Sequence, residues 1–271
     1  MQNLHSQLLR RPAAKDDKYS RGVVGFVTGS EEFPGAAILG VSAAMRVGVG
    51  MVRYLGPESV TKLVLEIRPE VVIQPGQAQA WVVGSGVTED AGSEQAKRIA
   101  KIASQPGLLV VDAGALALVD YSSVLATCVL TPHAGEMAAL LTRLGHRWSR
   151  ADVEEKPVDA AELAAKITGQ TVLLKGSKSV ISTSGESIVT KQAPADLATA
   201  GTGDVLAGVI GALLAANAQQ ILESELDIVE VCLFATELHA RAAEIAAAGG
   251  PVVALDVAEA IRDSVKEYLD A

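Results

Sequence analysis

Aromatic and cysteine residues are scarce in this chain of 271 residues. Phe, Trp and Tyr make up 3% of the sequence although 49% of it is hydrophobic, so the core must consist mainly of Ala, Val, Leu and Ile. Such residues suit parallel strands covered by close-packed helices. The two cysteines, Cys128 and Cys232, lie far apart and outside any CxxC or Cys/His cluster. This spacing argues against a disulfide framework or a zinc site and indicates ordinary buried thiols.

Basic charge and long apolar runs are also scarce. The net charge of −9 opposes nonspecific binding to nucleic acid or to an anionic membrane, because both need basic patches. The longest strongly apolar run, 205–216, is too short to cross a bilayer, and no signal peptide precedes the first predicted strand. We therefore expect a cytoplasmic protein with neither nucleic acid nor membrane as a partner. Small anions remain suitable ligands, since helix ends attract them locally.

Hydrophobic periodicity predicts an α/β fold, because strand patterns alternate with helical ones and so favour parallel crossovers. The expected strands are 23–28, 51–55, 71–73, 81–83, 108–111, 128–130 and 171–174. The expected helices are 34–47, 58–66, 94–103, 134–144, 160–168, 204–216, 226–247 and 255–269. A hairpin of 179–182 with 188–190 is predicted to add antiparallel strands, and 144–159 is interpreted as a surface connection. One domain over 1–271 is expected.

The sequence lacks a complete GxGxxG after a strand and has no GxxxxGK[ST], which argues against Rossmann and Walker-type nucleotide sites. Instead, Gly201-Thr202-Gly203-Asp204 leads directly into an apolar helix. Flexible glycines, unpaired first-turn N–H groups and the helix dipole together predict a phosphate site. Because a carboxylate repels phosphate, we interpret Asp204 as a proton acceptor for a substrate hydroxyl or as a residue that acts through a metal. The alternative is an Asp favoured by the helix dipole.

Further polar residues follow other predicted strands. The segment 174–179, which contains Lys175, predicts a nucleotide site built from backbone groups and a lysine, with a basic hairpin turn as the alternative. In 131–136, Glu136 is a candidate to hold a metal-bound water and His133 to touch a polar ligand, with helix capping that starts at Thr131 as the alternative. Asp112 ends an apolar strand and is expected to have a supporting role. Because carboxyl ends of parallel strands share one edge, these segments should line one cleft.

These segments together resemble the ADP- or ATP-dependent NAD(P)H-hydrate dehydratases, a branch of the ribokinase-like superfamily. The resemblance begins near Lys18 and rests on GSEEFPGAAILG (29–40), AWVVGSGV (80–87), VVDAGAL (110–116), TPHAGE (131–136), LLKGSKSVI (173–181) and LATAGTGDVLAG (197–208). The glycine–aspartate segment marks the superfamily, whereas TPHAGE and KGSKS point to the dehydratases. The resemblance implies a ribokinase-like three-layer sandwich with a mostly parallel central sheet, helices on both faces and a small antiparallel extension.

The family's reaction repairs damaged cofactor: the hydroxyl on the hydrated nicotinamide ring is phosphorylated by the nucleotide and eliminated as phosphate. The resemblance implies that Asp204 is the base and that Gly201, Thr202 and Gly203 form the anion hole. It assigns the AMP portion of the donor to Lys175, Gly176, Ser177, Lys178, Ser179 and Gly203. It assigns the hydrate to Ala37, Gly86, His133 and Asp204. It also implies ADP as the donor, with ATP as the alternative, together with Mg²⁺ and a homotetramer.

The chain departs from the family pattern in two loops. Asp112-Ala113-Gly114 stands where Asp-Ala-Asp is common, and Gly84-Ser85-Gly86-Val87 stands where Gly-Pro-Gly-Leu is common. Many relatives carry an amino-terminal epimerase domain, for which the short segment before the first predicted strand leaves no room, so we expect a separate epimerase protein as a functional partner.

Two other functions stay open at this point. One is a ribokinase-like kinase of a vitamin-precursor alcohol such as hydroxymethylpyrimidine or hydroxyethylthiazole, which would use the same base and anion hole. The other is a non-catalytic nucleotide-binding regulator. The intact 201–204 turn argues against the regulator, because nucleotide binding alone does not require it.

Overall fold

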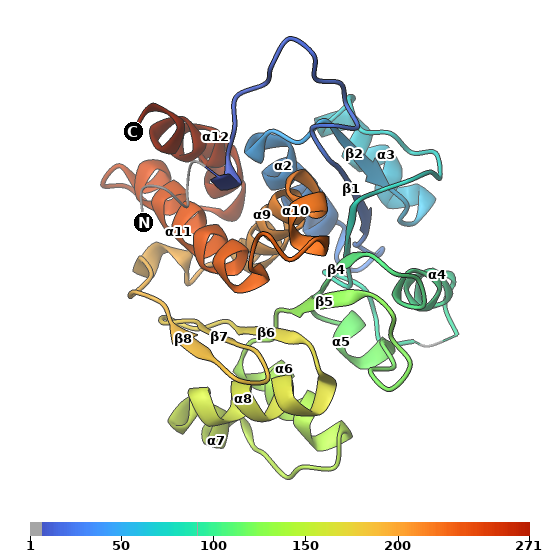
Figure 1. Ribbon diagram of the computed structural model, residues 1–271, viewed down its shortest axis with the longest axis vertical. Helices are drawn as coiled ribbons and strands as arrows, with labels where there is room; N and C mark the ends of the chain where they lie inside the picture. The colour runs from blue at the N-terminus through green and yellow to red at the C-terminus, as the bar shows by residue number, and fades with distance from the viewer. Residues whose placement is uncertain (1–6, 91) are drawn as a thin grey trace.

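An eight-stranded sheet forms the centre of the computed structural model, which describes residues 7–90 and 92–271 (Figure 1). The strand order is β2-β1-β3-β4-β5-β6-β7-β8. The strands are β1 (Val23–Val27), β2 (Met51–Tyr54), β3 (Ala80–Val83), β4 (Leu108–Val111), β5 (Thr127–Leu130), β6 (Thr171–Leu174), β7 (Val180–Ser182) and β8 (Ser187–Val189). Neighbours from β2 to β6 pair in parallel, whereas β7 and β8 are antiparallel. The predicted antiparallel extension is confirmed.

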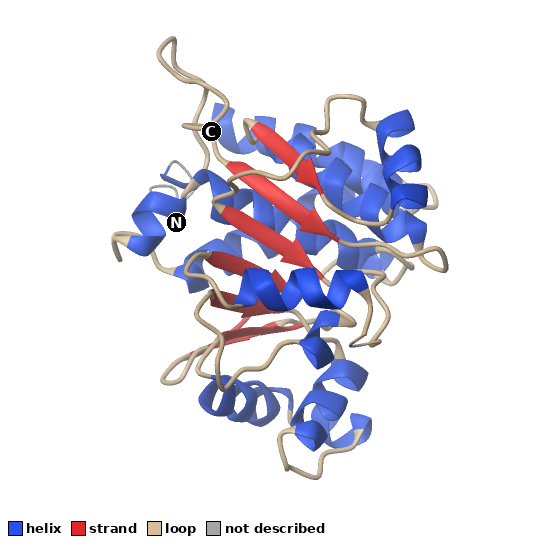
Figure 2. Cartoon of the chain, turned by 90° about the vertical axis from the view of Figure 1, so that its right-hand side faces the viewer, coloured by secondary structure: helices blue, strands red, loops and turns tan. Residues whose placement is uncertain are grey.

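Helices cover both faces of this sheet (Figure 2). One face packs against α2 (Pro34–Val47), α3 (Glu58–Ile67), α9 (Thr202–Ala216), α11 (Ile228–Ala247) and α12 (Ala254–Asp270). The other packs against α4 (Glu94–Ala103), α5 (Ala115–Leu118), α6 (Ala134–Arg143), α7 (Arg150–Glu155) and α8 (Pro157–Thr168). Short η1 (Ala195–Leu197) and α10 (Ala218–Leu222) flank α9. The two cores consist mostly of Ala, Val, Leu and Ile, as the composition predicted.

The close crossing of α2 and α9 positions the 201–204 turn, at which α9 begins. A Cβ on Gly208 would lie 2.2 Å from the carbonyl oxygen of Gly40, so only glycine permits this approach. A Cβ on Gly40 would in turn lie 3.3 Å from the carbonyl oxygen of Asp204. The packing of the two helices therefore holds the first turn of α9 in place.

Two expectations from the sequence were wrong. The segment 144–159 is not a plain connection, because it contains α7 and the start of α8 at Pro157. Helix α7 begins with a capping box between Ser149 and Asp152 and buries only Val153, so its apolar periodicity is too weak to detect. Residues 71–73 form no named strand, and Val72 makes a single bridge to Arg53.

Other differences concern helix ends and short elements. Helix α9 begins at Thr202, and α11 begins at Ile228 because the side chain of Asp227 caps it by accepting from the Val229 N–H. The short α5 and α10 were not predicted, since a single turn carries no periodic signal. None of the helices in the described ranges combines the length and apolar character needed to span a membrane.

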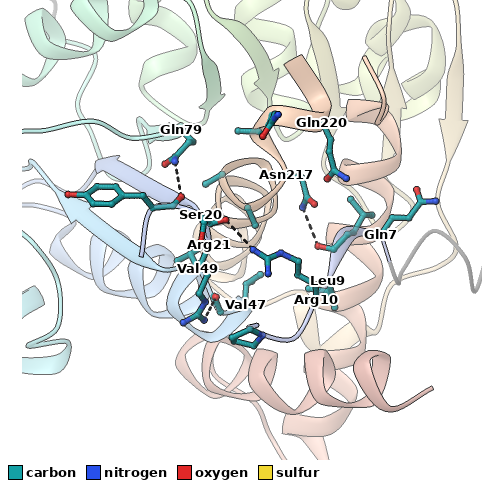
Figure 3. Close-up of a pocket in the computed structure, with 18 of the residues that line it drawn as sticks. Gln7, Leu9, Arg10, Ser20, Arg21, Val47, Val49, Gln79, Asn217 and Gln220 are labelled. Carbon is teal, nitrogen blue, oxygen red and sulfur yellow. Dashed lines mark hydrogen bonds between the residues drawn. The ribbon is translucent and has the colours of Figure 1, made fainter. Parts of the chain in front are cut away.

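A cavity of about 490 Å³ lies at the amino-terminal edge of the sheet (Figure 3). Three of its polar side chains have partners: Asn217 donates to the carbonyl of Leu8, Arg21 to that of Gly48 and Arg10 to that of Ser20. Asn217 follows the carboxyl end of α9, which has 15 residues and so is about 22 Å long. The cavity is therefore remote from Asp204, and its hydrogen bonds fasten the segment 7–22 to the domain.

Candidate active site

Loops that follow parallel strands meet at the carboxyl edge of the sheet. The N–H of Gly29, after β1, donates to the carbonyl of Ser85, after β3, at 2.7 Å. The N–H of Lys175, after β6, donates to the carbonyl of Pro132, after β5, at 2.8 Å. Asp112, after β4, lies between these two pairs of loops. The expected convergence on one edge is confirmed.

Asp112 is the centre of a buried polar network. Its side chain is 3% exposed and accepts hydrogen bonds from the Ser85 hydroxyl at 2.7 Å and the Thr131 hydroxyl at 2.8 Å. The Lys175 ammonium group donates to Asp112 Oδ1 at 2.7 Å. Burial alone would raise the pKa of Asp112, but the charge of Lys175 and the three hydrogen bonds outweigh it and lower the pKa. Asp112 is therefore an ionised carboxylate with its acceptor sites largely occupied.

Lys175 brings one positive charge into a group of carboxylates. Its Nζ is 2.7 Å from Asp112 Oδ1 and 3.9 Å from Glu136 Oε2. Burial opposes the charged form, but the charge of Asp112, followed by those of Glu136 and Asp204, raises the pKa of Lys175. The ammonium group is therefore protonated at neutral pH.

Asp204 lies in the first turn of α9 and is half-buried. Burial, with the negative charges of Asp112 and Glu136, raises its pKa to about 7, and Lys175 partly offsets this effect. A carboxyl group that titrates near neutral pH is suited to accept a proton from an alcohol and to release it again. The dipole-favoured structural role alone gives no reason for a raised pKa.

The turn before Asp204 has the features of an anion site. Gly201 has φ +92°, and a Cβ there would meet Leu39 Cδ1 at 2.5 Å. The Thr202 hydroxyl donates to the carbonyls of Leu197 and Thr199, and the Thr202 N–H donates to the Thr199 carbonyl at 3.4 Å, so both groups have partners within the protein. Within the described residues, the N–H groups of Gly203 and Asp204 have no backbone acceptor, as expected for a first helical turn. These donors favour an anion.

His133 and Glu136 cap α6. The Glu136 N–H donates to His133 Nδ1 at 3.1 Å, and the His133 N–H donates to Glu136 Oε2 at 2.8 Å. The capping alternative is thus correct, although the cap is His133 and not Thr131, whose hydroxyl bonds Asp112 instead. The His133 side chain is 59% exposed at the edge of the site, so capping leaves it open to a ligand.

The described residues contain no group of three or more His, Cys, Asp or Glu side chains arranged to hold a metal directly. Glu136 uses one oxygen in the capping box, and its side chain is 22% exposed. This leaves it able to hold a cation through water, which is the role that the sequence suggested.

The segment 175–179 is divided by the structure. Lys175 points toward the carboxylates, whereas Gly176, Ser177 and Lys178 are exposed in a loop. The loop is fixed because the carbonyls of Ser177 and Ser179 accept from the N–H groups of Ala193 and Thr190.

The two remaining candidates lie at the same edge but differ in exposure. Ala37 is fully buried in α2, and a Cβ on Gly29 would meet its methyl group at 2.9 Å. Gly86 is half-buried, with φ +67°, and a Cβ there would meet Ala36 and the Phe33 carbonyl. A ligand at these positions would contact mainly backbone.

Sequence reasoning missed the hydroxyl groups of Ser85 and Thr131. Ser85 stands where the family pattern has proline, and that departure was the available signal. Thr131 was considered only as a helix cap. Their shared contact with Asp112 depends on the adjacency of β3, β4 and β5, which local sequence does not report.

Comparisons with known proteins agree with this geometry. The family profile described as NAD(P)H-hydrate dehydratase matches residues 24–263. The chain is 40% identical over 220 residues to the bifunctional NAD(P)H-hydrate repair enzyme Nnr of Corynebacterium glutamicum, covering 75% of this chain and 37% of that protein. It is 33% identical over 227 residues to the ADP-dependent (S)-NAD(P)H-hydrate dehydratase of Xanthomonas campestris, covering 75% and 76% of the two chains.

A solved structure with the same fold is the ADP/ATP-dependent NAD(P)H-hydrate dehydratase of Bacillus subtilis, co-crystallised with ATP and Mg²⁺. It superposes with a TM-score of 0.82 at 25% identity, covering 99% of this chain and 97% of that one. The fold is ribokinase-like, as expected. The chain spans less than half the length of the bifunctional relatives from Corynebacterium and Mycobacterium that it matches. The match over most of its own length shows that this chain belongs to the NAD(P)H-hydrate dehydratase family.

Proposed function

We propose that this protein dehydrates the S form of hydrated NADH and NADPH at the expense of a nucleotide, and so restores the reduced cofactors. ADP is the proposed donor, with release of AMP and phosphate. The observation that carries the proposal is the half-buried Asp204 carboxyl, whose pKa lies at about 7, on an anion-binding helix start. Family membership and the names of the Xanthomonas and Bacillus proteins support it.

Asp204 supplies the chemistry that the reaction needs first. The hydroxyl of the hydrate must lose its proton as it attacks the terminal phosphoryl group of the donor, and a carboxylate with a near-neutral pKa accepts that proton. The C–O bond then breaks and the group leaves as phosphate, a far better leaving group than hydroxide, while the adjacent ring carbon loses a proton and the ring double bond forms. The N–H groups of Gly203 and Asp204 stabilise the negative charge on the phosphoryl oxygens.

Binding of the two substrates uses different parts of the edge. The loop 175–179 is the proposed nucleotide side, as its fixed backbone and lysines suit phosphates. The backbone at Gly86, the first turns of α2 near Ala37 and the exposed ring of His133 are the proposed hydrate side.

Mg²⁺ fits this arrangement through water. When bound, Mg²⁺ neutralises charge on the donor phosphates, and Glu136 would hold it through a water molecule. A direct protein cage is unnecessary because Mg²⁺ keeps several waters and takes phosphate oxygens as ligands.

The family profile, and not the base or the anion hole, favours the dehydratase over a kinase of a vitamin precursor. Both enzymes would use Asp204 and the glycine turn, so the fate of phosphate separates them. A kinase keeps the phosphoryl group on its product, whereas the dehydratase releases it.

We further propose a homotetramer and a separate epimerase as the functional partner, which light scattering and a coupled assay with the R form of the hydrate would test.

The test incubates the purified protein and Mg²⁺ with the S form of hydrated NADH and either ADP or ATP. Absorbance of restored NADH is followed together with AMP, ADP and phosphate. The proposal expects one phosphate per NADH, with AMP as the other product from ADP. Asp204→Asn serves as the matched inactive control. No restoration with either nucleotide, or a stable phosphorylated product, contradicts the proposal.

A further inference from the structure

We propose that Asp112 is a positioning residue that holds the ammonium group of Lys175 over the glycine turn, where this group binds the phosphoryl group in transfer and not the AMP portion. The inference deepens the proposed function and rests on it. It differs from the expectation that Lys175 belongs with 176–179 to the AMP side.

The position of the ammonium group is the first observation. A Cβ on Gly203 would lie 3.4 Å from Lys175 Nζ, so the charge stands directly beside the turn that precedes Asp204. The charge of Lys175 also acts on the pKa of Asp204. In phosphoryl transfer, the transferred group lies between the donor and the hydroxyl that the base deprotonates. A cation beside the base therefore contacts that group.

The surroundings of Asp112 are the second observation. The carboxylate is buried and accepts from Ser85, Thr131 and Lys175. Since its oxygens are occupied and negatively charged, it is unsuited to touch a phosphate itself. Two hydroxyl donors fix the carboxylate, and the carboxylate fixes the ammonium group, so Asp112 acts through Lys175.

The Ser85 contact is particular to this chain's loop sequence. A proline at this position, as in the resembled pattern, has no hydroxyl to donate to Asp112 Oδ2. The site also places three carboxylates, Asp112, Glu136 and Asp204, around one ammonium group. Without that positive charge, the carboxylates would repel the incoming phosphate.

The experiment is a double-mutant cycle on ligand binding. The variants are Asp112→Asn, Lys175→Met and the double variant, with Lys191→Met as the matched control because Lys191 is exposed and outside the site. Dissociation constants for AMP, ADP and pyrophosphate are measured by calorimetry on each protein, and thermal unfolding checks that each one is folded. The double variant removes both members of the buried ion pair, so it avoids leaving one charge unpaired.

The expected result separates the ligands. Lys175→Met raises the dissociation constants of ADP and pyrophosphate about tenfold or more, which is the effect of losing a charge-assisted hydrogen bond. The dissociation constant of AMP changes by less than about threefold. Asp112→Asn also raises the dissociation constant of ADP. The double variant binds ADP as Lys175→Met does, because Asp112 has no further lysine to position.

Three results would overturn the inference. The first is an equal loss of AMP and ADP affinity in Lys175→Met. The second is an ADP affinity in the double variant that falls by the product of the two single effects. The third is an unchanged ADP affinity in Lys175→Met. If Asp112→Asn alone does not fold, the comparison of the double variant with Lys175→Met still decides the question. Pyrophosphate binding that depends on Lys175, without any restoration of NADH, would contradict only the proposed dehydratase function. A wild-type protein that binds neither ADP nor pyrophosphate would contradict both that function and the role of Lys175.

Discussion

A Cβ atom on Gly114 would lie 2.1 Å from the carbonyl oxygen of Val87. The two loops in which this chain departs from the resembled pattern therefore pack directly on each other. An acidic residue at 114 is incompatible with the observed position of the loop 84–87, which also presents Ser85 to Asp112. The absence of a side chain at Gly114 is thus linked to the local course of the loop 84–87.

Gly114→Ala should destabilise the protein by about 1–3 kcal/mol, because the methyl group meets backbone that must move. The backbone at Gly114 has φ −59°, so the effect is steric and not conformational. Gly185→Ala is the control, since a Cβ there meets nothing within 4 Å. Chemical denaturation would measure both variants. Equal stability of the two would show that the loop yields freely.

The rate should depend on pH through Asp204. Because the base must be ionised and its pKa is about 7, kcat/KM is expected to rise with pH and to level off above that value. Asp204→Asn should lower turnover by about 10²–10⁴-fold while nucleotide affinity is kept. A pH–rate profile of the NADH-restoring reaction measures the first effect. A profile flat from pH 5 to 9, or near-normal turnover in the variant, would remove Asp204 as the base.

Asp204 should also cost stability at alkaline pH. Its pKa is raised from 3.8 to about 7 on folding, so the native state binds more protons between these values and stability falls as pH rises through them. Asp204→Asn should therefore be more stable than the wild type above pH 7, by about 1–4 kcal/mol, and show little difference at pH 4. Urea denaturation at both pH values measures this. A variant that is less stable at pH 8 would identify Asp204 as a structural cap.

His239 should limit stability in acid. It is buried in α11, where its Nε2 has no hydrogen-bond partner among the described residues, and burial lowers its pKa to about 4 despite a hydrogen bond with the Thr202 backbone. The unfolded chain takes up the proton between pH 6.5 and 4, so the stabilising contribution is present above 6.5 and is lost as pH falls. Between pH 6.5 and 4, the free energy of unfolding of His239→Gln should fall by about 2–3 kcal/mol less than that of the wild type. Urea denaturation at several pH values measures this difference. Parallel curves for the two proteins would show that His239 is not responsible.

His133 should serve both the fold and the hydrate. His133→Ala removes the cap of α6, which costs about 0.5–2 kcal/mol, and raises KM for the hydrate up to about tenfold by loss of a hydrogen bond. His133→Asn keeps a capping oxygen and should restore stability but not KM. Steady-state kinetics at saturating nucleotide, with a separate nucleotide titration, make the test. Loss of nucleotide affinity with unchanged hydrate KM would reverse the proposed halves of the site.

Local sequence was sufficient for the parts of the fold that carry a strong period or a clear start signal. Strand 108–111 and helices 34–47 and 94–103 were predicted with the observed bounds, because a buried parallel strand is continuously apolar and a helix shows a 3.6-residue repeat. The short α7 escaped detection, since one buried side chain makes no pattern. The sequence also placed a helix start at the 201–204 turn, and α9 begins at Thr202, whereas the anion site at this turn stays a prediction.

The sequence by itself predicted which residues are candidates for chemistry: a glycine turn with an aspartate, a lysine and a carboxylate at strand ends. Only the tertiary structure decided how these residues are arranged and which of them contact one another. The order of β3, β4, β5 and β6 places Ser85, Asp112, Thr131 and Lys175 side by side, although 27 and 63 residues separate Asp112 from Ser85 and Lys175. Burial and the neighbouring charges then set the pKa of Asp204. Such effects depend on distance and solvent exclusion, which no local pattern contains.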